Sequence, residues 1–125
     1  MGTIRDYKDL AVWQRARELA HEIYRLTEAL PREELFGLSS QIRRAAVSVP
    51  SNIAEGYGRH SLNDYIRFLK MARGSCYELE TQLILCLDLG YLSEPETQTA
   101  FSLIKQAQKL LISLLKSLET DCQNL

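Results

Sequence analysis

Two histidines, three cysteines and a group of cations are the residues of this 125-residue chain that could carry chemistry. His21 falls on the polar face of a predicted helix and His60 in a predicted turn, and no nucleophile or paired carboxylate accompanies either in a catalytic motif. Glu78 and Glu80 could join His60 around a metal, but the Glu-x-x-His spacing of di-iron bundles and the Cys/His spacing of zinc sites are both missing. We therefore expect a protein that is not an enzyme and that needs no cofactor or metal.

The cysteines and the lengths of the apolar runs predict the cellular compartment of the protein. Cys76 and Cys86 lie on one predicted helix, separated by a rise of roughly 15 Å, which is too far for a disulfide. An odd number of cysteines also fits reduced thiols. The apolar runs are far shorter than the ~20 residues of a membrane span, and the start of the chain lacks the features of a secretory signal. We expect a cytoplasmic protein that does not contact membranes.

Cations are concentrated between Gln41 and Arg73, although the whole chain has a net charge of −1. The six cations are Arg43, Arg44, Arg59, Arg67, Lys70 and Arg73, and the two acids between them are Glu55 and Asp64. Such a segment becomes a phosphate-binding surface if the chain assembles so that the segment repeats. In the alternative, Glu55, Glu78 and Glu80 pair with Arg43, Arg44 or Arg73, within one chain or across a subunit boundary.

The stretch from Phe36 to Arg59 contains the helix around which the chain is organised. Its apolar residues share one helical arc: Leu38, Ile42, Ala45, Ala46, Val49 and Ile53. Pro50 lies inside this pattern and removes the backbone donor that the carbonyl of Ala46 would use, so we expect a kink or another partner for that carbonyl. The Asn52 amide is a candidate partner for this loosened backbone, and a half-exposed Asn near a helix end is the alternative.

Capping and turn signals divide the rest of the chain into helices. Asp9 suits the start of the first helix, and Ser61 begins a capping-box sequence at the start of the third. Gly56 and Gly58 suit a left-handed cap and turn after the second helix, and Gly90 suits a cap after the third. The predicted helices span about 10–30, 37–55, 62–89 and 94–120, after an N-terminal arm at 1–9. This pattern predicts one domain over 1–125, an all-α, antiparallel up-down-up-down four-helix bundle.

Apolar residues cover more than one face of the third and fourth predicted helices, which is more than one core can bury. We therefore expect self-association of the chain. On the first helix, Tyr24 falls on the predicted core face. The candidate interface residues are Ile66, Tyr77, Ile84, Leu103 and Leu110.

Long motifs of the chain resemble a known family. FGLSSQIRRAAVSVPSNIAEGYGR at 36–59, preceded by Tyr7, Asp9, Leu10, Trp13 and Gln14 and followed by GSCYELETQL at 74–83, resembles the bacterial 23S rRNA intervening-sequence proteins, also called S23 ribosomal proteins. The chain is also similar to the accessory proteins of diversity-generating retroelements. The resemblance implies an antiparallel four-helix protomer, a ring-shaped homopentamer and a role in binding nucleic acid, with RNA such as ribosomal RNA as the ligand.

Two functions therefore remain open from the sequence. In the first, a non-enzymatic homo-oligomer binds RNA or DNA through the six cations of the basic segment. In the second, the same arginines pair with acids of neighbouring subunits, and the chain is a scaffold for a partner protein. The resemblance favours the first function, whereas the acidic pI of about 6.1 weighs against it.

Overall fold

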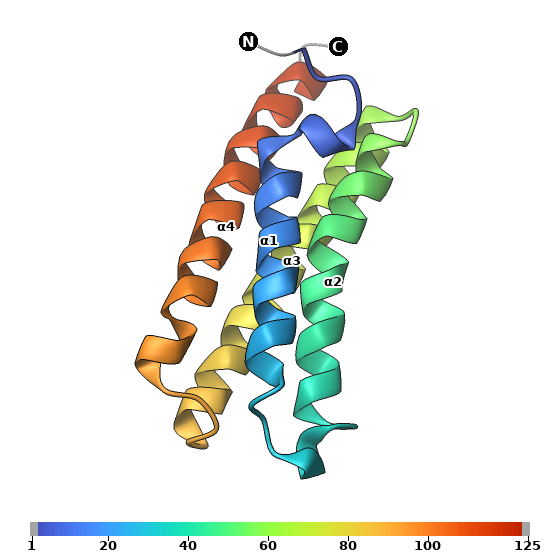
Figure 1. Ribbon diagram of the computed structural model, residues 1–125. Coiled ribbons are helices and arrows are strands. Elements are labelled where there is room, and N and C mark those ends of the chain that lie inside the picture. Colours follow the sequence, from blue (N-terminus) through green and yellow to red (C-terminus); the bar gives the residue numbers. More distant parts are fainter. Residues whose placement is uncertain (1–2, 124–125) are drawn as a thin grey trace.

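Residues 3–123 are described in the computed structural model, and within them the chain forms helices and no strand (Figure 1). The elements are α1 (Ala11–Thr27), α2 (Leu38–Tyr57), α3 (Leu62–Asp88) and α4 (Glu94–Gln123), with short 3-10 helices at Tyr7–Asp9 and Arg32–Glu34. Consecutive helices run in opposite directions, and each packs against two others in the cyclic order α1, α2, α3, α4. This arrangement confirms the predicted all-α, four-helix fold.

The core is a column of aliphatic side chains along the middle of the bundle. All four helices contribute fully buried residues: Leu19, Ile23, Ile42, Val49, Ile53, Leu69, Leu79, Leu83, Ile104 and Leu111. Their spacings of four, seven or ten residues on each helix put them on one face, which is why the helical periodicity of the sequence predicts them. Within the described residues, no helix is long and apolar enough to cross a membrane.

The start of the bundle differs from the sequence prediction. Asp9 does not cap α1, because its carboxylate accepts hydrogen bonds from the backbone N–H groups of Arg5 and Asp6, as part of a capping box around the first 3-10 helix. The helix α1 begins after Leu10 without a side-chain cap. The segment expected to be an arm is therefore partly folded, and the ring of Tyr7 packs edge-on against Trp13 at a centroid distance of 5.2 Å.

The turn between α2 and α3 also differs. Gly58 has a φ of −77°, so the predicted left-handed cap is wrong, and α2 continues to Tyr57. Gly56 has a packing role instead, since a Cβ there would lie 2.7 Å from the Cβ of Phe68. The two other turn predictions are confirmed: Ser61 accepts a hydrogen bond at the start of α3, and Gly90, with a φ of 75°, follows its end.

Pro50 is accommodated inside α2, and Asn52 lies one turn after Ser48. The Asn52 side-chain amide donates to the carbonyl and to the hydroxyl of Ser48, both at 2.8 Å, and so it does not compensate Ala46 as the sequence suggested. The Ser48 hydroxyl in turn shares a hydrogen bond of 2.8 Å with Ser75 of α3. A half-buried polar cluster, Ser48, Asn52 and Ser75, therefore joins the two helices beside the proline.

The structure corrects two of the five candidate interface residues. Ile66 and Leu103 belong to the buried core of the protomer, because α3 and α4 each pack against two neighbours and bury a wider arc than one stripe. Leu110 is half-buried and packs against this core. Tyr77 and Ile84 are exposed, as an interface role requires.

Candidate nucleic-acid interface

Three of the six cations in the basic segment are paired with acids of the same chain. Arg59 lies 3.5 Å from Glu55, Arg67 lies 3.7 Å from Asp64, and Lys70 lies 3.6 Å from Glu119. The first two pairs are neighbours within the chain, whereas the third joins α3 to α4. Each pair is exposed, so it adds little stability, but it places a negative charge beside the cation. The six cations therefore do not form one uninterrupted basic surface.

Arg43 is held against α1 by two contacts. Its Nε donates to the hydroxyl of Thr27 at 2.7 Å, and its guanidinium carbon lies 4.7 Å from the centroid of the Tyr24 ring. Thr27 is buried, and its hydroxyl donates to the carbonyl of Ile23 at 2.9 Å. These contacts fix the direction of the Arg43 side chain without neutralising its charge, because none of its partners is an acid.

Arg44 and Arg73 have no carboxylate within ion-pair distance among residues 3–123. The expected pairing of these arginines with Glu55, Glu78 or Glu80 within the chain is therefore wrong. Glu55 pairs with Arg59, and the carboxylate of Glu78 accepts a hydrogen bond from Gln82 at 3.4 Å. Pairing across a subunit boundary stays a prediction.

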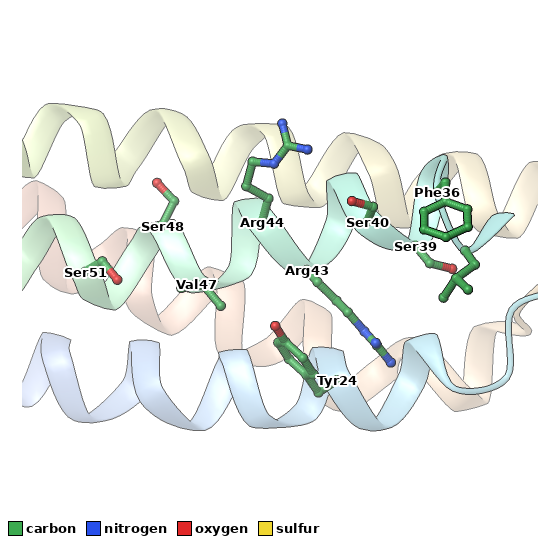
Figure 2. A pocket seen from close by; sticks show the side chains of 10 residues that line it. Tyr24, Phe36, Ser39, Ser40, Arg43, Arg44, Val47, Ser48 and Ser51 are labelled. Carbon is green, nitrogen blue, oxygen red and sulfur yellow. The ribbon is translucent and has the colours of Figure 1, made fainter.

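A shallow groove of about 720 Å³ brings the two adjacent arginines together with aromatic and hydroxyl side chains (Figure 2). It is lined by Tyr24, Leu35, Phe36, Ser39, Ser40, Arg43, Arg44, Val47, Ser48 and Ser51. Arg43 extends from α2 toward α1 beside Tyr24, whereas Arg44 extends to the other side of α2. No acidic residue lines this groove, so its two guanidinium groups dominate its charge. We call it the Arg43/Arg44 groove.

The aromatic members of this groove could not be predicted from the helical pattern. Tyr24 was expected in the core but is 42% exposed, because it lies at the edge of α1 where Arg43 crosses. Phe36 belongs to the segment between the second 3-10 helix and α2, and its side chain is 93% exposed. The sequence contains one hint of a groove at this place. Small residues leave space for a ligand at a helix surface, and four serines lie near Arg43 and Arg44: Ser39, Ser40, Ser48 and Ser51.

The other residues considered for chemistry are separate from the groove. Cys76 and Cys86 are buried thiols, and burial raises the pKa of Cys76 to about 12 and that of Cys86 to about 11. Thiols with such pKa values are poor nucleophiles at neutral pH. His21 and His60 are exposed. Among the described residues, no three His, Cys, Asp or Glu side chains form a group that could hold a metal ion.

Comparisons with known proteins agree with this geometry at the level of fold and family. A sequence model described as 23S rRNA-intervening sequence protein matches residues 8–113. The chain is also similar to a crystal structure of a protein of unknown function from the S23 ribosomal protein family of Bacteroides thetaiotaomicron. The two share 29% sequence identity with a TM-score of 0.79, over 85% of this chain and 99% of the other. No curated protein sequence gives a significant match.

Proposed function

Because this chain belongs to the 23S rRNA-intervening sequence protein family, we propose that it is a non-enzymatic, oligomeric protein that binds nucleic acid, with RNA as the first candidate. The observation that carries the proposal is the Arg43/Arg44 groove, whose lining contains the half-buried Arg43 and the exposed Arg44 but no acidic residue. The proposed place of action is the cytoplasm, where RNA is available.

The groove suits phosphate for electrostatic and geometric reasons. A guanidinium presents several N–H donors in a planar fork that matches phosphate oxygens. Thr27 uses only the Nε of Arg43, so the terminal nitrogens stay available for a ligand. The contacts to Thr27 and Tyr24 also reduce the entropy that Arg43 would lose on binding. Within the basic segment, this argument favours Arg43 and Arg44 over the acid-paired Arg59, Arg67 and Lys70.

Self-association would increase the affinity of such a small site. Two arginines per chain give weak binding, but several copies of the groove on one oligomer engage a polymer with a high effective concentration. The support for self-association is the exposed apolar side of α3, which carries Met71, Tyr77, Ile84 and Leu85 and is extended by Leu89 just after the helix. We propose that these copies form the pentameric ring that the family resemblance implies.

The same apolar side of α3 favours a second candidate function. A group of exposed apolar side chains is a common site for protein partners. If a different protein covers α3, the chain is an interaction scaffold, and nucleic-acid binding is not needed. The two functions make different predictions for the Arg43/Arg44 groove, because the scaffold does not use its arginines.

Replacing Arg44 separates these functions, with Arg59 as the matched control. Both side chains are exposed, but Arg59 is paired with Glu55 and lies outside the groove. We expect Arg44→Gln to weaken binding of labelled RNA and to reduce the slope of log affinity against log salt by roughly 0.7–0.9, the value of one lost phosphate contact. Arg59→Gln should retain most of the affinity.

Melting temperature and oligomer mass should be unchanged in both variants. A loss of RNA binding then cannot be attributed to a loss of structure or assembly. Equal losses in Arg44→Gln and Arg59→Gln would mean that only overall charge matters and that the groove is not the site. Wild-type protein that binds neither RNA nor DNA at low salt would eliminate the proposed function.

A further inference from the structure

We infer that the Arg43/Arg44 groove selects single-stranded over duplex nucleic acid by stacking a base on the ring of Phe36. This inference rests on the proposed function and adds the class of nucleic acid that the groove accepts. Its basis is an exposed aromatic ring on a folded segment that lines the same groove as two arginines without acidic partners.

The ring of Phe36 is exposed to solvent and lies in the lining of the groove. Phe36 is 93% exposed, the highest value among the large exposed hydrophobic residues of the described chain. A phenylalanine ring left in water forgoes the favourable free energy of burial, so a ligand that covers it gains that free energy. Its position beside the charged groove, rather than in the apolar surface of α3, distinguishes it from the candidate self-association residues. A base offers the flat apolar face that such a ring would cover.

The segment carrying Phe36 is held by hydrogen bonds on both sides of this residue. The backbone N–H of Gly37 donates to the carbonyl of Glu34 at 3.0 Å. The Glu34 carboxylate accepts from the backbone N–H of Leu38 at 3.2 Å and from the hydroxyl of Tyr91 at 2.9 Å, so it links the start of α2 to the loop before α4. The ring is therefore presented from an organised backbone, and less conformational entropy is lost when a ligand covers it.

Phe36 lies two residues before the start of α2, and Arg43 and Arg44 lie on the second turn of that helix. Arg44 lies six residues after Leu38, the first residue of α2, which corresponds to roughly 9 Å along the helix axis. This span is comparable with two to three base steps at roughly 3.4 Å per base along one strand. One short piece of strand can therefore place a base on Phe36 and its phosphates near Arg43 and Arg44.

Single strands and duplexes differ in how accessible the faces of their bases are. In a duplex the base faces are stacked on one another and are not accessible to a side chain, whereas the phosphates are accessible in both. The Arg43/Arg44 groove alone would therefore bind both forms, and the ring of Phe36 adds affinity for single strands only. The hydroxyls of Ser40 and Ser51, which are not buried, can donate to phosphate or sugar oxygens in either RNA or DNA.

The test compares wild type, Phe36→Leu and Phe36→Trp on three labelled probes: oligouridylate, oligodeoxythymidylate and a mixed-sequence duplex of the same length. Leu keeps the apolar character but removes the ring, and Trp restores a ring. We expect Phe36→Leu to weaken single-strand binding roughly thirtyfold, the middle of the range for one stacked base, with duplex binding unchanged. Phe36→Trp should bind single strands at least as tightly as wild type, and its emission should change on binding.

The outcomes separate this inference from the proposed function. If the wild type binds duplex and single strands equally and Phe36→Leu has no effect, the inference is wrong while the proposed function stands. If Phe36→Leu weakens both forms equally, the residue only shapes the groove, and the inference is again wrong. If the wild type binds no probe, both fail. Phe36-dependent binding of either single-stranded probe, RNA or DNA, supports the inference.

Discussion

For single residues, the packing around a glycine decides whether its replacement by alanine stabilises or destabilises the protein. Gly56 is buried where α2 meets α3, and an added Cβ would lie 2.7 Å from the Cβ of Phe68 and 3.3 Å from the carbonyl oxygen of Tyr65. Gly74 lies inside α3, and an added Cβ there would have no neighbour within 4 Å. Both positions have the same helical backbone, but only one has space.

We therefore expect opposite effects from two identical substitutions. Gly56→Ala should lower the free energy of unfolding by about 1–3 kcal/mol, because α2 and α3 must move apart. Gly74→Ala should raise it by about 0.5–1 kcal/mol, because alanine favours the helix and meets no obstacle. Urea denaturation of both variants beside wild type measures these changes. A stable Gly56→Ala would show that the two helices separate at little cost.

The six cations of the basic segment are also distinguished at the residue scale. Each is a long, charged side chain on or beside a helix, so the sequence offers no reason to rank them. The neighbours of each side chain make the difference: Arg59 has a carboxylate beside it, Arg43 has a hydroxyl and a ring, and Arg44 has no described ion-pair partner. Arg73 also has no described carboxylate partner, but it does not line the groove, so the proposed site contains two of the six.

At the scale of one element, α2 shows how a helix accommodates an internal proline. The backbone nitrogen of Pro50 cannot donate a hydrogen bond, yet the α-helix continues beyond it to Tyr57. Beside the proline, the Asn52 amide donates to Ser48, and Ser48 shares a hydrogen bond with Ser75. The polar cluster therefore connects α2 to α3 where the helix lacks one of its own hydrogen bonds.

This arrangement predicts that Asn52 contributes more to stability than Pro50. Pro50→Ala should preserve the fold and the melting temperature within a few degrees, because alanine restores a donor and suits a helix. Asn52→Leu should cost about 1–3 kcal/mol, since it removes two hydrogen bonds to Ser48 in a half-buried place. Thermal unfolding of both variants compares them. If Asn52→Leu melted at the same temperature as wild type, water would satisfy the hydrogen-bonding groups of Ser48 as well as Asn52 does.

For the molecule as a whole, the apolar side of α3 is a surface that the fold of one chain does not bury. Tyr77 is 52% exposed and Leu89 is 58% exposed, with Ile84 and Leu85 between them in the sequence. The core of the bundle is already complete without these side chains. A second copy of the chain can bury them, and this is the physical basis for the proposed oligomer.

We expect light scattering to give a mass several times the 14.3 kDa of one chain, with five chains as the specific prediction. Ile84→Glu should dissociate the assembly, because it would bury an unpaired carboxylate at the interface. Ile112→Glu, at an apolar residue of similar exposure on α4, is the control and should leave the mass unchanged. A wild type with the mass of one chain at micromolar concentration would contradict the prediction.

The helices of this protein and their order follow from its sequence alone. Helical periodicity, the serine before α3 and Gly90 after it are local signals, and local signals depend on residues within one or two turns of each other. The same signals predicted the buried faces, since a helix has one side that can meet the core. They were less accurate at the first helix start and at Gly58, where a neighbouring capping box and a close helix contact replaced the expected caps.

Which side chains of distant residues meet depends instead on how the helices pack. Arg43 contacts Thr27, Ser48 contacts Ser75 and Lys70 contacts Glu119 because antiparallel helices bring these positions to the same level. The exposure of Tyr24 and Phe36, and the burial of Ile66 and Leu103, follow from the same packing. A periodic pattern predicts the face of a helix but not the axial register or the width of its contact with two neighbours, and the candidate site depends on both.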